Sequence, residues 1–146
     1  LPMKAVVTRV KSASVTIDGK VNGKIGKGFL ILLGVGTEDT EKEAEKMCDK
    51  VCGLRIFEDE NGKMNINPTD AGAEFLIISQ FTLYADTSSR RPGFTKAARP
   101  DTAIPLYEKF IELCRERGFH CETGIFGAEM MVESINDGPL TILLDI

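Results

Sequence analysis

The sequence predicts a mixed α/β fold: a single compact domain in which a twisted, largely antiparallel β-sheet with barrel-like layers packs against two main helices. Runs of β-branched and apolar residues fill much of the chain, and only two segments repeat apolar residues at helical spacing. Turn signals such as Asp18-Gly19 separate the strand-like runs. Leu1 and Pro2 precede Met3, so we expect the domain to cover residues 3–146 without them.

The first part of the chain predicts three strands. Residues 4–17 are rich in β-branched side chains and partly alternate, which is typical of a strand. Asp18-Gly19 then turns the chain into a second strand over residues 20–26, which completes a hairpin. The continuous apolar run over residues 28–35 predicts a strand that is covered on both faces.

The first helix is predicted from Thr40 to Gly53. Thr40 and Glu43 form a capping-box pattern, and the apolar residues that follow recur at helical spacing. The preceding "LLGVGTEDT" resembles a dinucleotide-binding loop, but Asp39 takes the place of the third glycine. Since Glu38 and Asp39 would repel a phosphate, we interpret this segment as a helix start and expect no cofactor.

The second half of the chain predicts a short strand over residues 54–57 and a mostly irregular connection over residues 64–74. A strand-like segment follows over residues 75–86, and a second helix over residues 101–117. We expect the chain to end in a pair of strands that flank the Asp137-Gly138 turn signal.

Composition narrows the class of protein. A formal net charge of −4 argues against unselective nucleic-acid binding, though not against a local basic site. No apolar run approaches the roughly 18 residues of a membrane span, so we expect no membrane partner. With a single histidine, His120, and no C-x-x-C pair, we expect no metal site and a reducing, cytoplasmic setting. The cysteines, expected as free thiols, are Cys48, Cys52, Cys114 and Cys121.

The segment "SQFTL", residues 79–83, places polar residues inside an otherwise apolar strand, where they cost free energy unless they are hydrogen-bonded. One interpretation is an ordinary strand end that emerges from the core. The other is a pocket in which backbone N–H groups around Gln80 and Phe81 bind an oxyanion beside Thr82. Since no general base stands near Thr82 in the sequence, we expect it to position the substrate rather than attack it.

A basic loop follows this segment. Residues 90–99 contain no acidic residue, and on an acidic protein such a loop suits phosphate contact. A solvated surface loop is the other interpretation. Its basic residues, which we expect to contact phosphates if the loop binds a nucleic acid, are Arg90, Arg91, Lys96 and Arg99. A non-catalytic RNA- or DNA-binding protein that uses this loop is the alternative to an enzyme.

Two motifs together resemble the D-aminoacyl-tRNA deacylase family, also called D-tyrosyl-tRNA deacylase: "SQFTL" at 79–83 and "NDGPLT" at 136–141. The opening "KAVVTRVKSASV" and the internal "GKMNIN" are similar as well. The resemblance implies a cytoplasmic homodimeric hydrolase, without cofactor or metal, that releases D-amino acids from tRNA with assistance from the ribose 2′-hydroxyl. A deacylase for another misacylated tRNA is a further alternative. The resemblance assigns the catalytic roles to Ser79, Gln80, Phe81 and Thr82.

The resemblance also gives a role to Pro139, which as a residue without an N–H group is unexpected at the start of a strand. It implies that the Gly138-Pro139 peptide is cis and reaches into the active site of the partner subunit, where both carbonyls accept hydrogen bonds from the substrate ammonium. Asn136 and Thr141 belong to the same substrate-binding motif, and Arg9 matches a family arginine that braces it. An L-substrate would turn its side chain into the wall or lose the ammonium contact, whereas glycine has no side chain to exclude. Glycyl-tRNA mischarged on tRNA(Ala) is therefore a second expected substrate.

Overall fold

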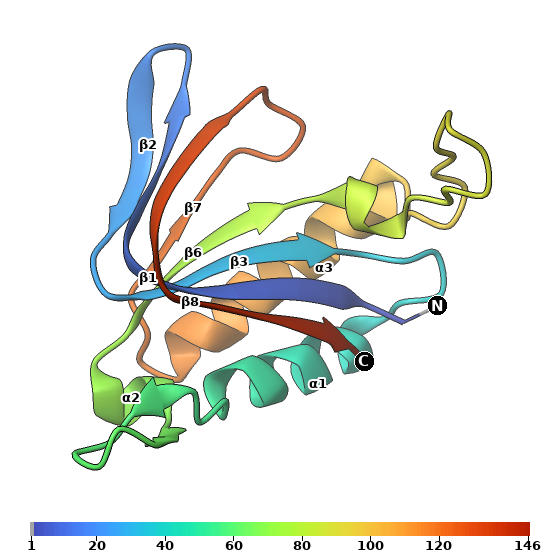
Figure 1. Cartoon of the computed structure of the whole chain (residues 1–146). Coiled ribbons are helices and arrows are strands. Elements are labelled where there is room, and N and C mark those ends of the chain that lie inside the picture. The colour runs from blue at the N-terminus through green and yellow to red at the C-terminus, as the bar shows by residue number, and fades with distance from the viewer. Residues whose placement is uncertain (1) are drawn as a thin grey trace.

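A computed structural model describes residues 2–146, so Leu1 lies outside the described residues, while the carbonyl of Pro2 accepts a hydrogen bond from Tyr84. The mixed α/β class with two main helices is confirmed (Figure 1). The elements are β1 (Lys4–Ile17), β2 (Lys20–Ile25), β3 (Gly28–Gly34), α1 (Glu41–Cys52), β4 (Phe57–Glu58), β5 (Met64–Ile66), α2 (Pro68–Ala71), β6 (Glu74–Ser79), the 3₁₀ helix η1 (Phe81–Tyr84), α3 (Pro100–Glu116), β7 (Cys121–Thr123) and β8 (Met131–Asp145).

The long strand β1 organises the main sheet. It pairs antiparallel with β2, β3 and β8, while the β3–β6 and β6–β7 pairs are parallel. The strand order is β2-β1-β3-β6-β7, and β8 adds to β1 outside this path. The sheet bends strongly, so that β2 and the first half of β8 turn away from the helices (Figure 1). This curvature produces the barrel-like layers that the strand-rich sequence predicts.

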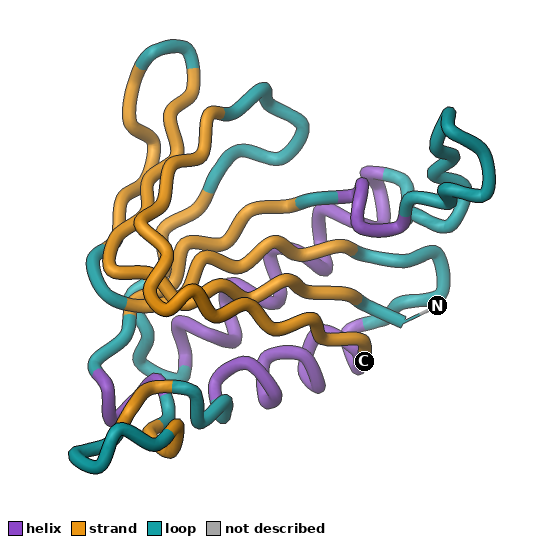
Figure 2. The backbone as a smooth tube through the Cα atoms, viewed as in Figure 1, coloured by secondary structure: helices purple, strands orange, loops and turns teal. Residues whose placement is uncertain are grey.

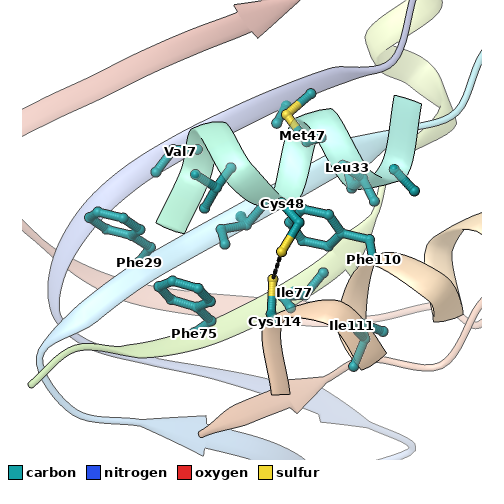
Figure 3. Packing of buried hydrophobic residues seen from close by; sticks show 14 of the residues in the cluster. Val7, Phe29, Leu33, Met47, Cys48, Phe75, Ile77, Phe110, Ile111 and Cys114 are labelled. Atoms are coloured by element: carbon teal, nitrogen blue, oxygen red, sulfur yellow. Dashed lines mark hydrogen bonds between the residues drawn. The ribbon is translucent and has the colours of Figure 1, made fainter. Parts of the chain in front are cut away.

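Helices α1 and α3 lie on the same side of the flatter part of the sheet (Figure 2). The period-2 alternation of β3 explains the core, because Phe29, Ile31 and Leu33 face the helices while Leu30 faces a second, smaller apolar cluster. Phe29 also stacks on Phe75 of the parallel neighbour β6, with ring centroids 5.5 Å apart. Figure 3 shows these side chains packed against the buried faces of both helices. The prediction that β3 is covered on both faces is confirmed.

Helix α1 begins as the sequence predicts. Thr40 is the N-cap, and its backbone N–H donates to the Glu43 carboxylate at 2.7 Å, which completes the capping box. Asp39, which directly precedes the N-cap, is a buried acidic residue. Its side chain accepts a hydrogen bond from the Gly36 N–H at 2.7 Å, and burial raises its pKa.

The predicted pair of strands at the end of the chain is wrong. Residues 131–145 form one continuous strand, β8, both halves of which pair with β1. The register explains the bend in β8, because Val10 faces Asn136 whereas Thr8 faces Thr141. Two steps along β1 therefore match five along β8, and the turn signal produces a bulge instead of a reversal.

Three further predictions need correction. The strand expected over residues 75–86 ends at Ser79 and is followed by η1. The strand expected over residues 54–57 is shorter and shifted to β4, and the connection expected to be irregular contains β5 and α2. Strand β7, which has only three residues, was not expected. These elements are too short for periodicity to reveal them.

None of the helices in residues 2–146 has both the length and the apolar character needed to cross a membrane.

Candidate functional site

The "SQFTL" segment lies where β6 ends and η1 begins. The Gln80 N–H donates to the Leu33 carbonyl at 2.8 Å, so it continues the sheet and is not available to a substrate, contrary to the expectation from the sequence. The next two N–H groups, of Phe81 and Thr82, open the 3₁₀ helix and make no hydrogen bond within residues 2–146. Helix starts generally leave such donors free. The available pair of donors is therefore Phe81 and Thr82.

The Thr82 hydroxyl is held by its neighbour. The Gln80 side-chain amide donates to Thr82 Oγ1 at 2.5 Å. The chain has one histidine, His120, and this side chain pairs with Glu122 at 2.8 Å after α3. An oxygen that accepts an amide N–H, without a base beside it, is suited to positioning rather than to nucleophilic attack.

A cavity of about 290 Å³ opens beside these donors. Its walls combine the end of β6 with the segment that leads into β8, and Phe81 stands 52% exposed at its rim. The lining residues are Ile78, Ser79, Gln80, Phe81, Phe126, Gly127, Ala128, Met130 and Val132. An apolar pocket with a few convergent polar groups is the usual form of a small-ligand site. A larger open groove of about 760 Å³ along α3 contains none of the residues of the two motifs.

Gly34 allows η1 to approach the sheet. A Cβ atom added to Gly34 would lie 3.2 Å from the Gln80 carbonyl oxygen, from Leu83 Cβ and from the Tyr84 ring. These distances are tighter than ordinary van der Waals contact. A larger residue on β3 would therefore push η1, with its two free N–H groups, away from its present position.

The basic loop is attached to the same end of the sheet. Phe94 meets Phe81 edge to face, with ring centroids 5.1 Å apart, and the Lys96 carbonyl accepts a hydrogen bond from Thr37 N–H at 3.2 Å. Gly93 and Asp86 exchange two backbone hydrogen bonds of 2.8 and 3.0 Å that close the loop. The four basic side chains of the loop are exposed, and they are Arg90, Arg91, Lys96 and Arg99.

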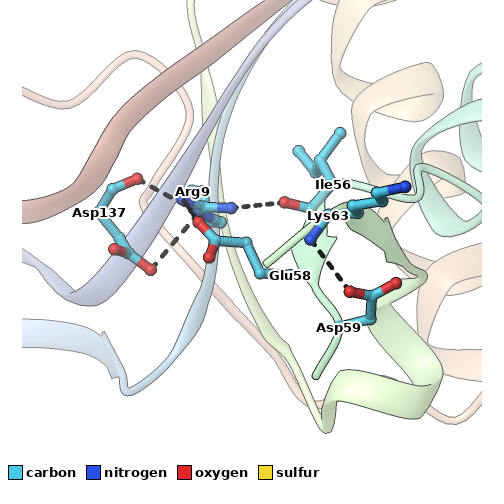
Figure 4. A network of polar contacts seen from close by, with 6 residues as sticks. All are labelled: Arg9, Ile56, Glu58, Asp59, Lys63 and Asp137. Atoms are coloured by element: carbon cyan, nitrogen blue, oxygen red, sulfur yellow. Dashed lines mark hydrogen bonds and ion pairs between the residues drawn. The ribbon is translucent and has the colours of Figure 1, made fainter. Parts of the chain in front are cut away.

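A buried arginine supports the second motif (Figure 4). The Arg9 side chain is 5% exposed, and its Nε donates to the Asp137 carbonyl at 3.2 Å and lies 3.4 Å from the Asp137 carboxylate. Nη1 donates to the Ile56 carbonyl at 2.6 Å, and Nη2 lies 3.7 Å from Glu58. Ile56 and Glu58 were not expected at this motif, because only the tertiary fold brings β4 to β1.

The Gly138-Pro139 peptide is cis and exposed within the bulge of β8, as the resemblance implies. Gly138 has φ +126°, and a Cβ atom there would lie 3.2 Å from Arg9 Nη2, so the position requires glycine. The flanking residues are in the sheet: the Thr141 hydroxyl lies 3.4 Å from that of Thr8, and Asn136 Oδ1 accepts a hydrogen bond from Ser134.

The two motifs do not meet within one chain. Gly138 lies level with Arg9, which faces Phe29 on β3, whereas Ser79 faces Leu33. The four residue steps from Phe29 to Leu33 span about 13 Å, and three strand spacings across the sheet span about 14 Å. The motifs are thus on the order of 20 Å apart. Figure 1 shows η1 and the bend in β8 at opposite ends of the sheet.

Comparison with known proteins gives a consistent result. The family model described as D-Tyr-tRNA(Tyr) deacylase matches residues 6–145. A protein of Koribacter versatilis named D-aminoacyl-tRNA deacylase is 55% identical over 144 residues, which cover 98% of this chain and 97% of the relative. A protein of Bacillus velezensis with the same name is 54% identical and covers 98% of each chain.

Two solved structures are similar over nearly the whole chain. One, titled as a c-Myc DNA unwinding element binding protein, has a TM-score of 0.93 with 43% identity and covers 98% of both chains. The other, titled as a probable eukaryotic D-amino acid tRNA deacylase, has a TM-score of 0.88 and covers 100% of both chains. At 14% identity, the second similarity supports the fold alone.

Proposed function

Because the chain belongs to the D-Tyr-tRNA(Tyr) deacylase family, we propose that it hydrolyses the ester bond of D-aminoacyl-tRNA to free D-amino acid and tRNA, and spares L-aminoacyl-tRNA. The observation that carries this proposal is the pair of unpaired N–H groups at Phe81 and Thr82, beside a cavity at the end of β6. Ester hydrolysis needs such donors, because negative charge develops on the carbonyl oxygen in the transition state.

The proposed mechanism uses the backbone of η1 rather than an activated side chain. The N–H groups of Phe81 and Thr82 stabilise the oxyanion, and each such donor is commonly worth about 3–4 kcal/mol of transition-state stabilisation. Gln80 and Thr82 hold each other through their side chains and position the ester, while Ser79 ends the strand at the pocket wall. Water attacks with assistance from the ribose 2′-hydroxyl, so no cofactor is required.

We propose that the active unit is a homodimer. The Gly138-Pro139 motif is exposed and on the order of 20 Å from η1 in its own chain, so only a second copy would bring it to the pocket. Strand β8 is also an edge strand that pairs only with β1. It carries exposed apolar side chains, which are uncommon on an edge that faces water. These are Met131, Val132, Ile135 and Leu143.

In this dimer the motif would act as the stereochemical filter. The carbonyls of Gly138 and Pro139 accept hydrogen bonds from the α-ammonium of the substrate, Asn136 and Thr141 flank them, and Arg9 holds the bulge in place. An L-substrate would turn its side chain into the wall or lose the charged hydrogen bonds, at a cost of roughly 1.5–3 kcal/mol. Glycine has no side chain to exclude, so glycyl-tRNA mischarged on tRNA(Ala) is also a proposed substrate.

The basic loop would contact the tRNA. Arg90, Arg91, Lys96 and Arg99 are exposed, and Phe94 fixes the loop against Phe81 next to the pocket. These positive side chains would bind phosphates near the aminoacylated end of the tRNA, while the N–H groups of η1 act on the ester. The proposed place of action is the cytoplasm, where aminoacyl-tRNA is consumed and where the free cysteines would stay reduced.

The direct test is to incubate the purified protein with tRNA charged with either D- or L-tyrosine and to measure release of the labelled amino acid. We expect rapid loss of the D-ester while the L-ester persists. Equal rates on both esters would contradict the filter at Gly138 and Pro139. Hydrolysis of neither ester would contradict the proposed reaction.

One observation favours a second candidate. A structural relative that is 43% identical is titled as a DNA-binding protein, and the basic loop suits a nucleic-acid backbone. If the protein is a non-catalytic binding protein, only substitutions in the basic loop should change its affinity for RNA. Phe81→Pro, which removes an N–H donor, should abolish hydrolysis but keep RNA affinity if the protein is a deacylase. Arg90→Ala should weaken RNA binding under either function.

A further inference from the structure

Four buried thiols lie apart from the reaction site. Three of them meet between the two main helices: Cys48 and Cys52 belong to α1, and Cys114 belongs to α3. The Sγ atom of Cys48 lies 3.8 Å from that of Cys52 and 3.8 Å from that of Cys114, and all three Sγ atoms lie within 4.8 Å of one another. Figure 3 shows Cys48 and Cys114 directed toward each other across the helix pair.

This spacing fits a metal ion. A Zn–S bond is about 2.3 Å long, so two sulfur ligands on a tetrahedral ion are about 3.8 Å apart. The distances between the three thiols are therefore already close to those in a thiolate site, and no helix has to move far. Sulfur ligands prefer soft ions over Mg²⁺ or Ca²⁺.

We propose that Cys48, Cys52 and Cys114 bind one divalent ion of the zinc and cadmium class through three thiolates, which links α1 to α3. The thiols lose three protons on binding, and the three thiolates with the divalent ion carry one net negative charge. The nearby Arg117, which pairs with Asp49 at 3.2 Å, would offset that charge. A monovalent ion would leave two negative charges in an apolar core and is less favourable.

Cys48 lies at the centre of the trio, because its Sγ atom is the one that contacts the thiols of both Cys52 and Cys114. Access is possible from the end of α1, because Cys52 is 7% exposed, whereas Cys48 and Cys114 are 1% and 0% exposed.

The fourth cysteine supplies a matched control. Cys121 is also buried, but its thiol donates to the Phe119 carbonyl at 3.7 Å and it does not belong to the trio. Replacing Cys121 removes the same chemical group from the same core without removing a proposed ligand.

The test is a titration of the reduced full-length protein with Cd²⁺ under anaerobic conditions, followed by thiolate-to-cadmium absorption and equilibrium dialysis. We expect saturation at one ion per chain and a higher melting temperature, because the ion binds the folded state. Cys114→Ala should abolish the absorption band, whereas Cys121→Ala should keep it. Cys52→Ser, at the more exposed position, serves as the second ligand variant if Cys114→Ala does not fold.

A band of equal size in Cys114→Ala and Cys52→Ser would overturn the proposal, as would the absence of any saturable band. Loss of the band in Cys121→Ala would overturn the assignment to three ligands. Hydrolysis of D-tyrosyl-tRNA by the metal-free variants separately measures whether the proposed deacylase site is intact. The two proposals can therefore fail independently.

Discussion

At the scale of the single residue, Arg9 connects three segments that are distant in the sequence. Its guanidinium contacts the carbonyls of Asp137 and Ile56 and lies close to the carboxylates of Asp137 and Glu58. Because Arg9 is buried on β1, these contacts set where the bulge of β8 stands relative to the sheet. The filter proposed at Gly138 therefore depends on a residue that does not itself touch substrate.

Replacing Arg9 with methionine should affect both stability and activity. The carbonyl of Ile56 would lose a buried donor, so we expect the free energy of unfolding to fall by about 1–3 kcal/mol. We also expect D-ester hydrolysis to fall more than about tenfold as the bulge loses its support. Urea denaturation and deacylation assays measure the two effects. Lys4→Met, which removes an exposed ion pair at the start of β1, is the control and should change stability by less than about 1 kcal/mol.

Thr82 distinguishes a positioning role from a nucleophilic one. Thr82→Val keeps the shape and the backbone N–H but removes the acceptor of the Gln80 amide. A positioning hydrogen bond worth about 0.5–1.5 kcal/mol predicts a fall in kcat of at most about tenfold. Single-turnover hydrolysis of D-tyrosyl-tRNA measures this change, with the exposed Thr87→Val as the control. A complete loss of hydrolysis in folded Thr82→Val would mean that the hydroxyl takes part in the chemistry.

At the scale of the element, local hydrogen bonds determine the start of α1, whereas pairing with a distant strand determines the bulge of β8. Thr40 and Glu43 hydrogen-bond each other, and neither bond depends on the rest of the fold. The bulge, by contrast, exists because both halves of β8 pair with β1. Whether a turn signal such as Asp137-Gly138 reverses the chain or forms a bulge therefore depends on the strand with which its flanking residues pair.

The cap of α1 predicts a pH-dependent contribution to stability. Hydrogen bonds from the side chain and backbone of Thr40 lower the pKa of the Glu43 carboxyl. A carboxyl with a lowered pKa stabilises the folded state above its unfolded pKa, and this stabilisation is lost as the pH falls through the folded pKa. Thr40→Ala should thus cost about 1 kcal/mol at pH 7 and less at pH values below the ordinary glutamate pKa. Thermal unfolding of both proteins across this range measures the difference, with Glu45→Gln as the mid-helix control.

At the scale of the whole molecule, the main feature is the separation of the two motifs. Each motif contains exposed residues, and the two stand at opposite ends of the sheet. The edge strand β8 exposes Ile135 and Leu143 at 61% and 73%. A second copy that covers this strand would bury its apolar surface and would also complete the active site. A change that prevents dimer assembly should therefore abolish activity as well.

A mixed dimer tests this arrangement. Gly138→Ala disrupts the filter, and Phe81→Pro removes an oxyanion donor, so each homodimer should be inactive. If each site combines η1 of one chain with Gly138 of the other, every heterodimer has one intact site. Random exchange of subunits should then restore about a quarter of the wild-type rate. Sites confined to one chain would give no recovery, and circular dichroism of each variant alone controls for folding.

Local sequence was sufficient for much of this protein. The capping box at Thr40, the hairpin at Asp18-Gly19 and the doubly covered strand β3 were all expected from a few neighbouring residues, because hydrogen bonds within a turn and period-2 burial are local. The two motifs were also recognisable in the sequence, since their residue types carry a family pattern.

The tertiary structure decided what depends on distant partners. Pairing with Leu33 occupies the Gln80 N–H and moves the free donors to Phe81 and Thr82. Pairing with β1 turns an expected hairpin into one bulged strand, and packing of α1 on α3 joins Cys114 to two thiols in the first helix. These contacts join residues that are distant in the sequence, so no short segment could predict them. The hydrogen-bond partners and the packed faces depend on the whole fold.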